Sequence, residues 1–311
     1  MIGVMRQDTE DMEALLDIDA WISTQSERVE SALAEVIQDN VSLELAGAMR
    51  YAVLDGGKRL RPLLVLAVAQ AVGAQASEAS MRAACAVELI HAYSLVHDDM
   101  PCMDNDVLRR GKPTVHVQYG EAIAMLAGDA LQALAFEVLT PECAGVPYEV
   151  QARLVHLLSR ASGTAGMAGG QAIDLLSVGK MLDEMQLRRM HMYKTGALLA
   201  CCINMGVACQ QGGVEERAKA ALRDYAAHVG LAFQVVDDIL DVTSQSDVIG
   251  KTVGKDASAD KPTYVSVLGL EAAERYVQEL YEKAMQALAQ SGLSDIAPLQ
   301  ELTKKMVRRS Y

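Results

Sequence analysis

The stretch VELIHAYSLVHDDMPCMD, residues 87–104, decides how this chain folds and where its chemistry lies. Its first half is apolar enough for a buried helix, and Asp98, Asp99 and Asp104 follow where that helix ends. Pro101 breaks the helix and lets the chain curl Asp104 back towards Asp98. Carboxylates at about 6 Å and an effective dielectric of about 20 repel by roughly 3 kcal/mol per pair, and the helix dipole disfavours them as well. The stretch therefore predicts a bound cation.

A second cluster of aspartates follows another apolar run, in FQVVDDILD at residues 233–241. Asp237 and Asp241 are four residues apart, so both lie on one face of a helix. A single motif of this kind is usually a solvated helix end, but two of them, each after a buried helix, favour a metal site. Oxygen ligands without a cage of Cys or His indicate Mg²⁺, which usually shares its coordination shell with phosphate groups.

Basic residues gather in two short segments that suit phosphate groups. In GGKRLRP, residues 56–62, they crowd the start of a helix, whose dipole favours an anion. These residues are Lys58, Arg59 and Arg61. Arg109 and Arg110 follow the first aspartates closely enough to bind a phosphate group that also touches the metal. A surface turn or a neutralising pair would explain either segment alone, but not both beside two acidic motifs.

Further polar residues are candidates for contacts near the metal. They are His91, Gln171, Asp174, Lys194, Thr195 and Gln234. His91 lies two helical turns before Asp98 on about the same face, so it is either a core histidine or a substrate contact. The glycine-rich run 163–170 lacks the context of a phosphate loop and is interpreted as small residues that allow close helix packing. The segment 243–262 is predicted to be a lid, with Lys251 and Lys261 as closing contacts on phosphate.

Composition fits a soluble protein of 311 residues that is 51% hydrophobic and can bury a core without disulfides. The net charge of −13 argues against nucleic acid and anionic membranes as partners. The six cysteines show no zinc spacing and are interpreted as free buried thiols in a reducing cytosol. No leader peptide is recognised, and the most apolar stretch, 62–72, is too short to span a bilayer. The predicted location is cytoplasmic.

Apolar residues recur at helical spacing almost throughout, and no run alternates with period two. The chain is therefore predicted to be all-α, with about ten helices, no sheet and a single domain over 1–311. Ser26 is predicted to cap the first helix. The other helices are predicted at 62–72, 78–97, 121–139, 148–161, 181–208, 215–240, 270–290 and 297–309.

Together these segments resemble the trans-isoprenyl diphosphate synthases, most closely the bacterial farnesyl/geranylgeranyl type. The matches run in the family's order over about 200 residues: GGKRLRP (56–62), ELIHAYSLVHDDMPCMDNDVLRRGKPT (88–114), AGDAL (127–131), GMAGGQAIDL (166–175), YKTGALL (193–199), FQVVDDILD (233–241) and GK (250–251). The resemblance implies the isoprenoid synthase fold, with helices around a deep central cavity, usually in a homodimer. It implies a prenyltransferase that condenses isopentenyl diphosphate head-to-tail with allylic diphosphates.

The resemblance also implies roles for individual residues. Three Mg²⁺ ions would be held by the aspartates Asp98, Asp99, Asp104, Asp237 and Asp241. Isopentenyl diphosphate would be bound by Lys58, Arg61, His91 and Arg110. The allylic diphosphate would be bound by Arg109, Gln171, Lys194, Lys251 and Lys261. The reacting allyl group would be lined by Lys194, Thr195 and Gln234. Asp260 stands where the family often has glycine, so Lys255 could substitute for Lys261.

Product length depends on Tyr93 and Ser94, five and four residues before Asp98. In the family a large ring at this place blocks the growing chain, which favours a fifteen-carbon product, farnesyl diphosphate. The alternative is a twenty-carbon product, geranylgeranyl diphosphate. A non-catalytic subunit of a heteromeric synthase would have lost aspartates that this chain keeps. A terpene cyclase would have a different second metal motif. It acts on one substrate, so it would not need the basic Gly-Lys-Arg segment at 57–59.

Overall fold

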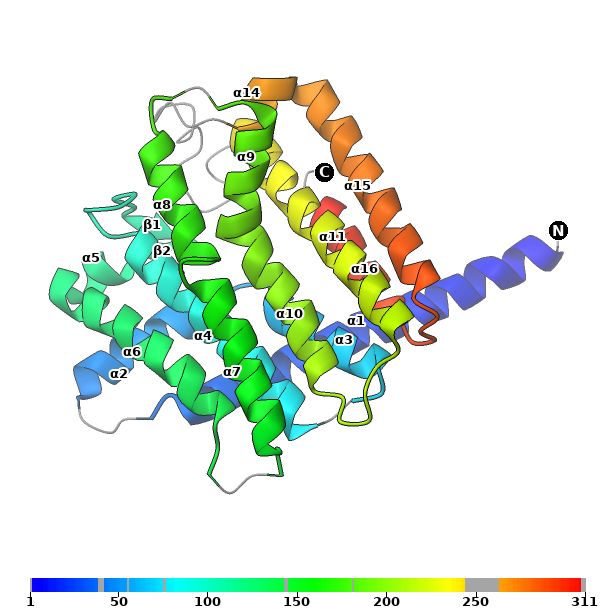
Figure 1. The fold of residues 1–311 in the computed structure, drawn as a ribbon, viewed down its shortest axis with the longest axis horizontal. Helices are drawn as coiled ribbons and strands as arrows, with labels where there is room; N and C mark the ends of the chain where they lie inside the picture. The colour runs from blue at the N-terminus through cyan, green and yellow to red at the C-terminus, as the bar shows by residue number, and fades with distance from the viewer. Residues whose placement is uncertain are drawn as a thin grey trace.

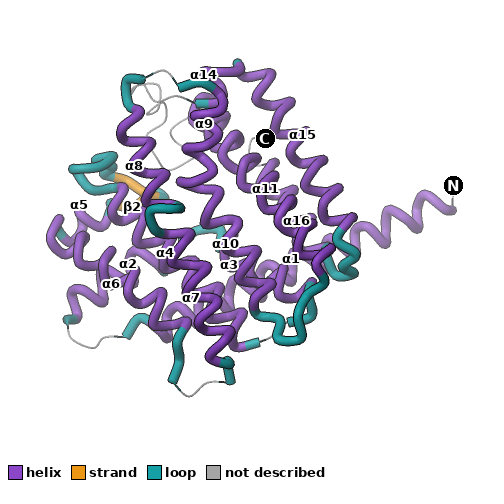
Figure 2. Tube along the Cα trace, viewed as in Figure 1, coloured by secondary structure: helices purple, strands orange, loops and turns teal. Residues whose placement is uncertain are grey.

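The computed structural model describes residues 2–38, 42–54, 56–74, 77–142, 145–180, 182–243 and 263–308, with side chains from residue 18 on. Helices make up nearly all of these segments (Figure 2). The first half of the chain contains α1 (Ile2–Val36), α2 (Leu43–Val53), α3 (Leu60–Ala71), α4 (Glu78–Asp98), β1 (Leu108–Arg109), β2 (Lys112–Pro113), α5 (Val115–Tyr119) and α6 (Glu121–Leu139).

The second half is equally helical. It contains α7 (Tyr148–Ser162), α8 (Met167–Ser177), α9 (Glu184–His191), the π-helix η1 (Met192–Gly196), α10 (Ala197–Ala208), α11 (Glu216–Thr243), α14 (Tyr264–Leu268), α15 (Leu270–Gln290) and α16 (Ala297–Val307). The all-α class predicted from the sequence is confirmed. The only strands in the described segments are β1 and β2, a two-residue antiparallel hairpin that the sequence analysis did not foresee.

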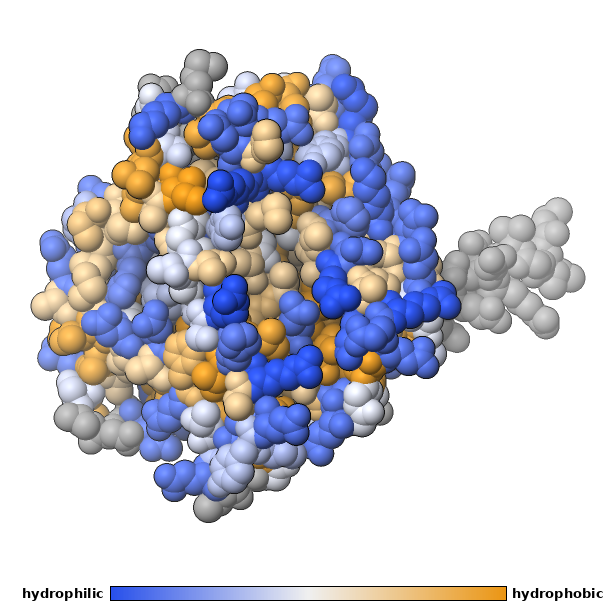
Figure 3. Space-filling view, in the orientation of Figure 1, coloured by the Kyte–Doolittle hydropathy of each residue, from blue (hydrophilic) through white to orange (hydrophobic). Residues whose placement is uncertain are grey.

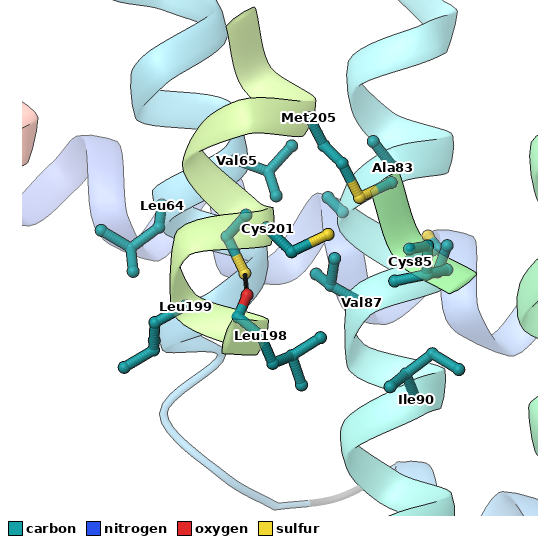
Figure 4. Close-up of a cluster of buried hydrophobic side chains, with 14 of the residues drawn as sticks. Leu64, Val65, Ala83, Cys85, Val87, Ile90, Leu198, Leu199, Cys201 and Met205 are labelled. Carbon is teal, nitrogen blue, oxygen red and sulfur yellow. Dashed lines mark hydrogen bonds between the residues drawn. The ribbon is translucent and has the colours of Figure 1, made fainter. Parts of the chain in front are cut away.

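The core is built around α3, α4 and α10, which run through the middle of the molecule (Figure 1). Ten of the twelve residues of α3 are buried, so this helix is apolar all round, as predicted. Figure 4 shows Val65 from α3, Val87 from α4 and Met205 from α10 in one buried cluster, with Leu64 and Ile90 on either side. Such packing fixes the direction of α4, and with it the place where the first aspartates leave the helix.

Three helix predictions need correction. Ser26 does not cap a helix, because α1 continues through it from Ile2 to Val36. The predicted helix 181–208 is interrupted by the π-helix η1, which presents Lys194 and Thr195. The helix at 62–72 was predicted to be the most apolar stretch and too short to span a bilayer, but α6 is long and apolar enough, by length and composition alone, to cross a membrane. It packs, however, against α4 and α2.

Among the described residues, cysteine placement follows the prediction with one exception, and Cys143 lies outside the described residues. Cys85, Cys201, Cys202 and Cys209 are free and buried, whereas Cys102 is exposed. Hydrophilic side chains cover much of the face drawn in Figure 3. Apolar side chains also reach the surface over α8, where Leu175 and Leu176 are exposed (Figure 3).

Candidate active site

The first aspartate motif is a compact loop at the C-terminal end of α4. The amide N–H of Asp104 donates to the carbonyl oxygen of Asp98 over 2.9 Å, and that of Asp106 donates to Asp99 over 3.1 Å. Helical hydrogen bonding therefore stops at Asp98, and the chain returns as Pro101 predicted. The return brings Asp98 and Asp104 close enough for their charges to interact.

Asp98 has an electrostatic environment that disfavours its charge. Its pKa is raised from 3.8 to about 6, chiefly because burial removes water from the carboxylate. The charge of Lys194 opposes this shift, whereas the neighbouring charge of Asp104 adds to it. A carboxylate that is ionised at neutral pH despite such surroundings gains free energy when a cation arrives.

Asp99 has the opposite environment. Its side chain is buried, and the guanidinium of Arg109 donates to both carboxylate oxygens, with Nε at 2.7 Å from Oδ2 and Nη2 at 2.5 Å from Oδ1. A bidentate pair of this kind fixes the orientation of the guanidinium. The structure thus gives Asp99 a role in positioning Arg109. The predicted role of Asp99 as a metal ligand stays a prediction, and it would require Arg109 to release the carboxylate.

The π-helix η1 brings Lys194 to Asp174 and within range of the charge of Asp98. Its ammonium group donates to Oδ2 of Asp174, on α8, over 2.5 Å, and its charge also acts on Asp98. This close approach depends on a glycine of the run 163–170, because a Cβ on Gly170 would lie 2.1 Å from the backbone nitrogen of Lys194. The interpretation of the glycine-rich run as a packing surface is confirmed there.

A chain of hydrogen bonds joins η1 to the second aspartate motif on α11. Thr195 Oγ1 donates to Oε1 of Gln234 over 2.9 Å, and Nε2 of Gln234 donates to Oδ1 of Asp238 over 3.0 Å. The N–H of Tyr264, which opens α14, donates to Oδ2 of Asp238 over 2.7 Å. Thr195 and Gln234, singled out in the sequence, are therefore direct neighbours.

Two residues of this network were not found by sequence reasoning. Asp238 is buried and anchors α14, and Nε2 of His191 lies 3.8 Å from its Oδ2. The imidazole of His191 stacks on the ring of Tyr264, and burial lowers the pKa of this histidine to about 4. His191 is thus neutral at physiological pH. Nothing in the local sequence distinguishes it from a core histidine, because its partners come from distant helices.

Asp237 and Asp241 are half-buried and one turn apart on the same face of α11, as their spacing predicts. Gln171, on α8, has a buried side-chain amide whose nitrogen and oxygen lack hydrogen-bond partners among the described residues. An amide in that condition is suited to a polar ligand. His91, Tyr93 and Ser94 follow one another on α4, before Asp98. Lys251 and Lys261, with the predicted lid, lie outside the described residues.

The three cations of the segment 56–62 separate into two groups. Arg59 turns inwards and donates to Glu88 over 2.7 Å and to Glu30 over 2.8 Å, so its predicted contact with phosphate is wrong. Lys58 is exposed. The guanidinium of Arg61 lies 5.9 Å from the ring centroid of Phe233, and its buried Nε has no hydrogen-bond partner in the described segments.

Arg110 joins this basic group from the β1–β2 hairpin. Its guanidinium lies against Gly57, where a Cβ would come within 2.9 Å of it, so the glycine admits the side chain. The pKa of Arg110 is lowered by desolvation, with further contributions from the charges of Arg59 and Arg61. A concentration of cations that lowers a guanidinium pKa is a strong attractor for an anion. Arg110 also lines a pocket between α2, α4 and the hairpin.

The described residues contain no group of three Asp, Glu, His or Cys side chains close enough to hold a metal ion by themselves. Mg²⁺ in such a site would need oxygen ligands from elsewhere, as it does when it binds with a phosphate-bearing substrate. The desolvated Asp98 beside Asp104 fits that requirement. The residues present are therefore suited to Mg²⁺ that arrives together with a diphosphate.

Comparisons with known proteins place the chain in a family. The family model described as polyprenyl synthetase matches residues 43–295. The chain is 44% identical to farnesyl diphosphate synthase of Haemophilus influenzae, covering 87% of this chain and 88% of that one. It is 45% identical to geranylgeranyl pyrophosphate synthase 3, chloroplastic, of Arabidopsis thaliana, covering 96% and 83%. A solved structure of Helicobacter pylori geranyltransferase, complexed with magnesium and isoprenyl diphosphate, superposes with a TM-score of 0.82 at 35% identity, covering 92% and 96%.

Proposed function

Because the chain belongs to the polyprenyl synthetase family, we propose that it condenses isopentenyl diphosphate with dimethylallyl and then geranyl diphosphate to give farnesyl diphosphate. The observation that carries the proposal is the position of Lys194. Its ammonium group donates to Asp174 on α8 and its charge acts on Asp98 on α4, while Thr195 beside it is joined to the second motif through Gln234. An allylic diphosphate bound between the two aspartate motifs would contact Lys194 directly and the aspartate carboxylates through bound metal ions.

Mg²⁺ would be held by Asp98, Asp104 and Asp237, with Asp241 beside them, and we propose three ions per site. When bound, Mg²⁺ would neutralise charge on the leaving diphosphate. The raised pKa of Asp98 supports this assignment, because the carboxylate is costly without a cation. A structural neighbour that contains magnesium and isoprenyl diphosphate supports the choice of metal.

The two substrates would be bound by different basic side chains of the protein. Arg61 and Arg110, with Lys58 and His91, would bind the diphosphate of isopentenyl diphosphate. Arg109, oriented by Asp99, would bind the allylic diphosphate with Lys194 and Gln171, and Lys251 and Lys261 are predicted to add contacts. The unpartnered Nε of Arg61 and the unpartnered amide of Gln171 support these roles, since buried polar groups need partners.

Reaction would begin when the C1–O bond of the allylic diphosphate breaks and both electrons leave with the diphosphate. Arg109 and Lys194 would stabilise that negative charge. Thr195 and Gln234, fixed to each other over 2.9 Å, would present oxygen atoms to the allylic cation. The double bond of isopentenyl diphosphate would then attack C1 of the allylic cation. The departed diphosphate would accept the proton that the isopentenyl unit loses from the carbon beside its new cationic centre. Exclusion of water protects the cation meanwhile.

The proposal of a fifteen-carbon product rests on Tyr93, with Ser94 beside it. It does not rest on overall sequence identity to known synthases. Identity is 44% to a farnesyl and 45% to a geranylgeranyl synthase, so it does not separate the two products. Tyr93 is 8% exposed and lies at the packed boundary between α4 and α6. A ring held there would stop a chain that grows from the aspartates along α4.

We also propose that the protein is a homodimer that uses α6. This helix has a mean hydropathy of 1.6, yet only 39% of its most apolar window is buried within the chain. Leu126 is 52% exposed, and Val117 on α5 is 51% exposed. A second copy would cover this apolar surface symmetrically. Leu126→Arg should give a monomer by light scattering, and a monomeric wild type would refute the proposal.

The cytoplasmic location and the single domain over 1–311 stay predictions. The function is tested by incubating purified protein with Mg²⁺, dimethylallyl diphosphate and isopentenyl diphosphate, and identifying the dephosphorylated products by mass. A fifteen-carbon alcohol is the expected result. A twenty-carbon alcohol would refute the farnesyl assignment and leave the condensation chemistry intact. Absence of any condensation product would refute the enzymatic proposal and favour a non-catalytic subunit.

A further inference from the structure

The hydrogen bonds that join Thr195, Gln234 and Asp238 can run in only one direction. An ionised carboxylate accepts hydrogen bonds and donates none, so the part of the Gln234 amide that faces Asp238 must be its NH2 group. Nε2 of Gln234 lies 3.0 Å from Oδ1 of Asp238, and Oε1 therefore faces Thr195, at 2.9 Å. A carbonyl oxygen only accepts, so the Thr195 hydroxyl must donate its proton to Gln234. The lone pairs of that hydroxyl then point away from the amide.

The carboxylate of Asp238 is held in place through its other oxygen. Asp238 is 3% exposed, and its Oδ2 accepts the N–H of Tyr264 over 2.7 Å. That N–H belongs to the backbone of α14 and cannot turn round to become an acceptor. Both oxygens of the carboxylate therefore accept, one from α14 and one from Gln234. The direction of the hydrogen bonds is set at Asp238.

The close approach of η1 to α11 gives Thr195 this partner. A threonine hydroxyl inside a helix often donates to a carbonyl oxygen of the preceding turn. Thr195 donates instead to Gln234, 39 residues further along the chain. Two glycines allow the approach, since a Cβ on Gly230 would lie 3.2 Å from Cα of Gly196. Gly230 is one turn before Gln234 on α11, and Gly196 directly follows Thr195, so the glycines lie beside the residues that they bring together.

We propose that Asp238 is a positioning residue that fixes, through Gln234, the direction in which the Thr195 hydroxyl faces the allylic cation. The inference rests on the proposed function, in which Thr195 lies beside the reacting allyl group. With its proton donated to Gln234, the hydroxyl presents the negative end of its dipole to the cation and stabilises the ionised state. In the opposite direction the same hydroxyl would present its proton and destabilise that state. Asp238 needs no contact with metal or substrate for this role.

Asp238→Asn should reverse the direction while keeping both hydrogen bonds. The asparagine has one carbonyl oxygen, and the fixed N–H of Tyr264 selects it, so the NH2 group faces Gln234. The Gln234 amide must then turn over, and Thr195 becomes an acceptor whose own proton can point at the cation. The single-turnover rate of condensation should fall about 100-fold, as when one preorganised donor is removed from an oxyanion hole.

A double-mutant cycle with Thr195→Val separates this role from a metal-binding or a purely structural one. Thr195→Val removes the hydroxyl, so in that background Asp238→Asn should change the single-turnover rate by less than about twofold. A lost metal contact or a loosened α14 would lower the rate about equally in both backgrounds, and an equal loss would overturn the proposal.

Asp237→Asn is the matched control for metal binding. It should raise the Mg²⁺ concentration at half-maximal rate about tenfold or more, as changes at metal sites commonly do. Asp238→Asn should leave that concentration within about twofold of the wild-type value, because single changes at independent sites act separately. An Mg²⁺ requirement raised as much by Asp238→Asn as by Asp237→Asn would overturn the proposal.

Gln234→Glu provides a rescue. Combined with Asp238→Asn, its carboxylate accepts from the asparagine on one side and from the Thr195 hydroxyl on the other, which restores the original direction. The combined variant should recover at least about tenfold of the rate that Asp238→Asn loses. No recovery, or an equal recovery when Thr195→Val is added, would overturn the proposal. These outcomes leave the proposed function standing, because the wild type makes a condensation product in each of them. A wild type that makes none would overturn the proposed function and this inference together.

Discussion

Replacing Asp98 by asparagine should stabilise the metal-free protein while removing its activity. The pKa of Asp98 is raised from 3.8 to about 6, chiefly by burial. A rise of about two units corresponds to about 3 kcal/mol of free energy that the folded state loses when this carboxyl is ionised. Asparagine has nearly the same shape and carries no charge, so Asp98→Asn should recover most of that free energy.

The gain should depend on pH in a defined direction. The folded-state pKa is the higher one, so ionisation lowers stability as the pH rises from 3.8 through about 6, and the full loss is present above that range. Below 3.8 the carboxyl is protonated in both states and the difference vanishes. The advantage of Asp98→Asn should therefore be about 3 kcal/mol near pH 8 and about half of that near pH 5.

The assay is urea unfolding with a chelator present, at both pH values, with the exposed Asp224→Asn as the control. Asp224→Asn should change stability by less than about 0.5 kcal/mol at either pH. Addition of Mg²⁺ and inorganic diphosphate should then raise the melting temperature of the wild type and not that of Asp98→Asn. An Asp98→Asn protein no more stable than the wild type near pH 8 would refute the argument that this carboxylate is prepared for a cation.

Three further substitutions test other parts of the site. Tyr93→Ala removes the whole ring, so the ratio of twenty- to fifteen-carbon product should rise about tenfold or more, the equivalent of about 1.4 kcal/mol; an unchanged ratio would place the barrier elsewhere. Arg61→Ala should raise the KM for isopentenyl diphosphate about 10- to 100-fold, and that for the allylic substrate less, because hydrogen bonds between charged groups are worth about 1.5–3 kcal/mol; the reverse order would exchange the two substrate sites. Arg59→Met should destabilise the fold by about 3–5 kcal/mol in urea unfolding, because it leaves Glu88 buried without its partner; a change below about 1 kcal/mol would contradict the buried ion pair.

Helical periodicity predicted those helices whose apolar faces are decided locally. The helices at 121–139 and 270–290 have the predicted bounds in the structure. The prediction for 181–208 missed η1, because a π-helical turn depends on what packs against it, and apolar spacing does not report that. The packing partners are glycines from other helices: a Cβ on Gly230 would lie 3.2 Å from Cα of Gly196.

The basic segment 56–62 shows a similar limit to what the sequence alone can predict. Three cations at a helix start looked equivalent in the sequence, because their charge and spacing alone predict phosphate binding. The structure separates Arg59 from the others through Glu30 and Glu88, each 29 residues away along the chain. Burial decides between an ion pair of the core and an anion site, and burial at this position is a tertiary property.

In each pair of consecutive aspartates, Asp98–Asp99 and Asp237–Asp238, the two residues have different surroundings. In each pair the second residue faces inwards: Asp99 is held by Arg109, and Asp238 is held by Gln234 and the N–H of Tyr264. The first residue, Asp98 in α4, is left with a charge that burial makes costly. Consecutive residues on a helix point about 100° apart, so one aspartate can anchor neighbouring elements while the other faces the site. We therefore propose that in each doubled aspartate the outward residue serves as a cation ligand, while the inward residue fixes the arginine or the helix beside it; the predicted role of Asp99 as a metal ligand remains a prediction.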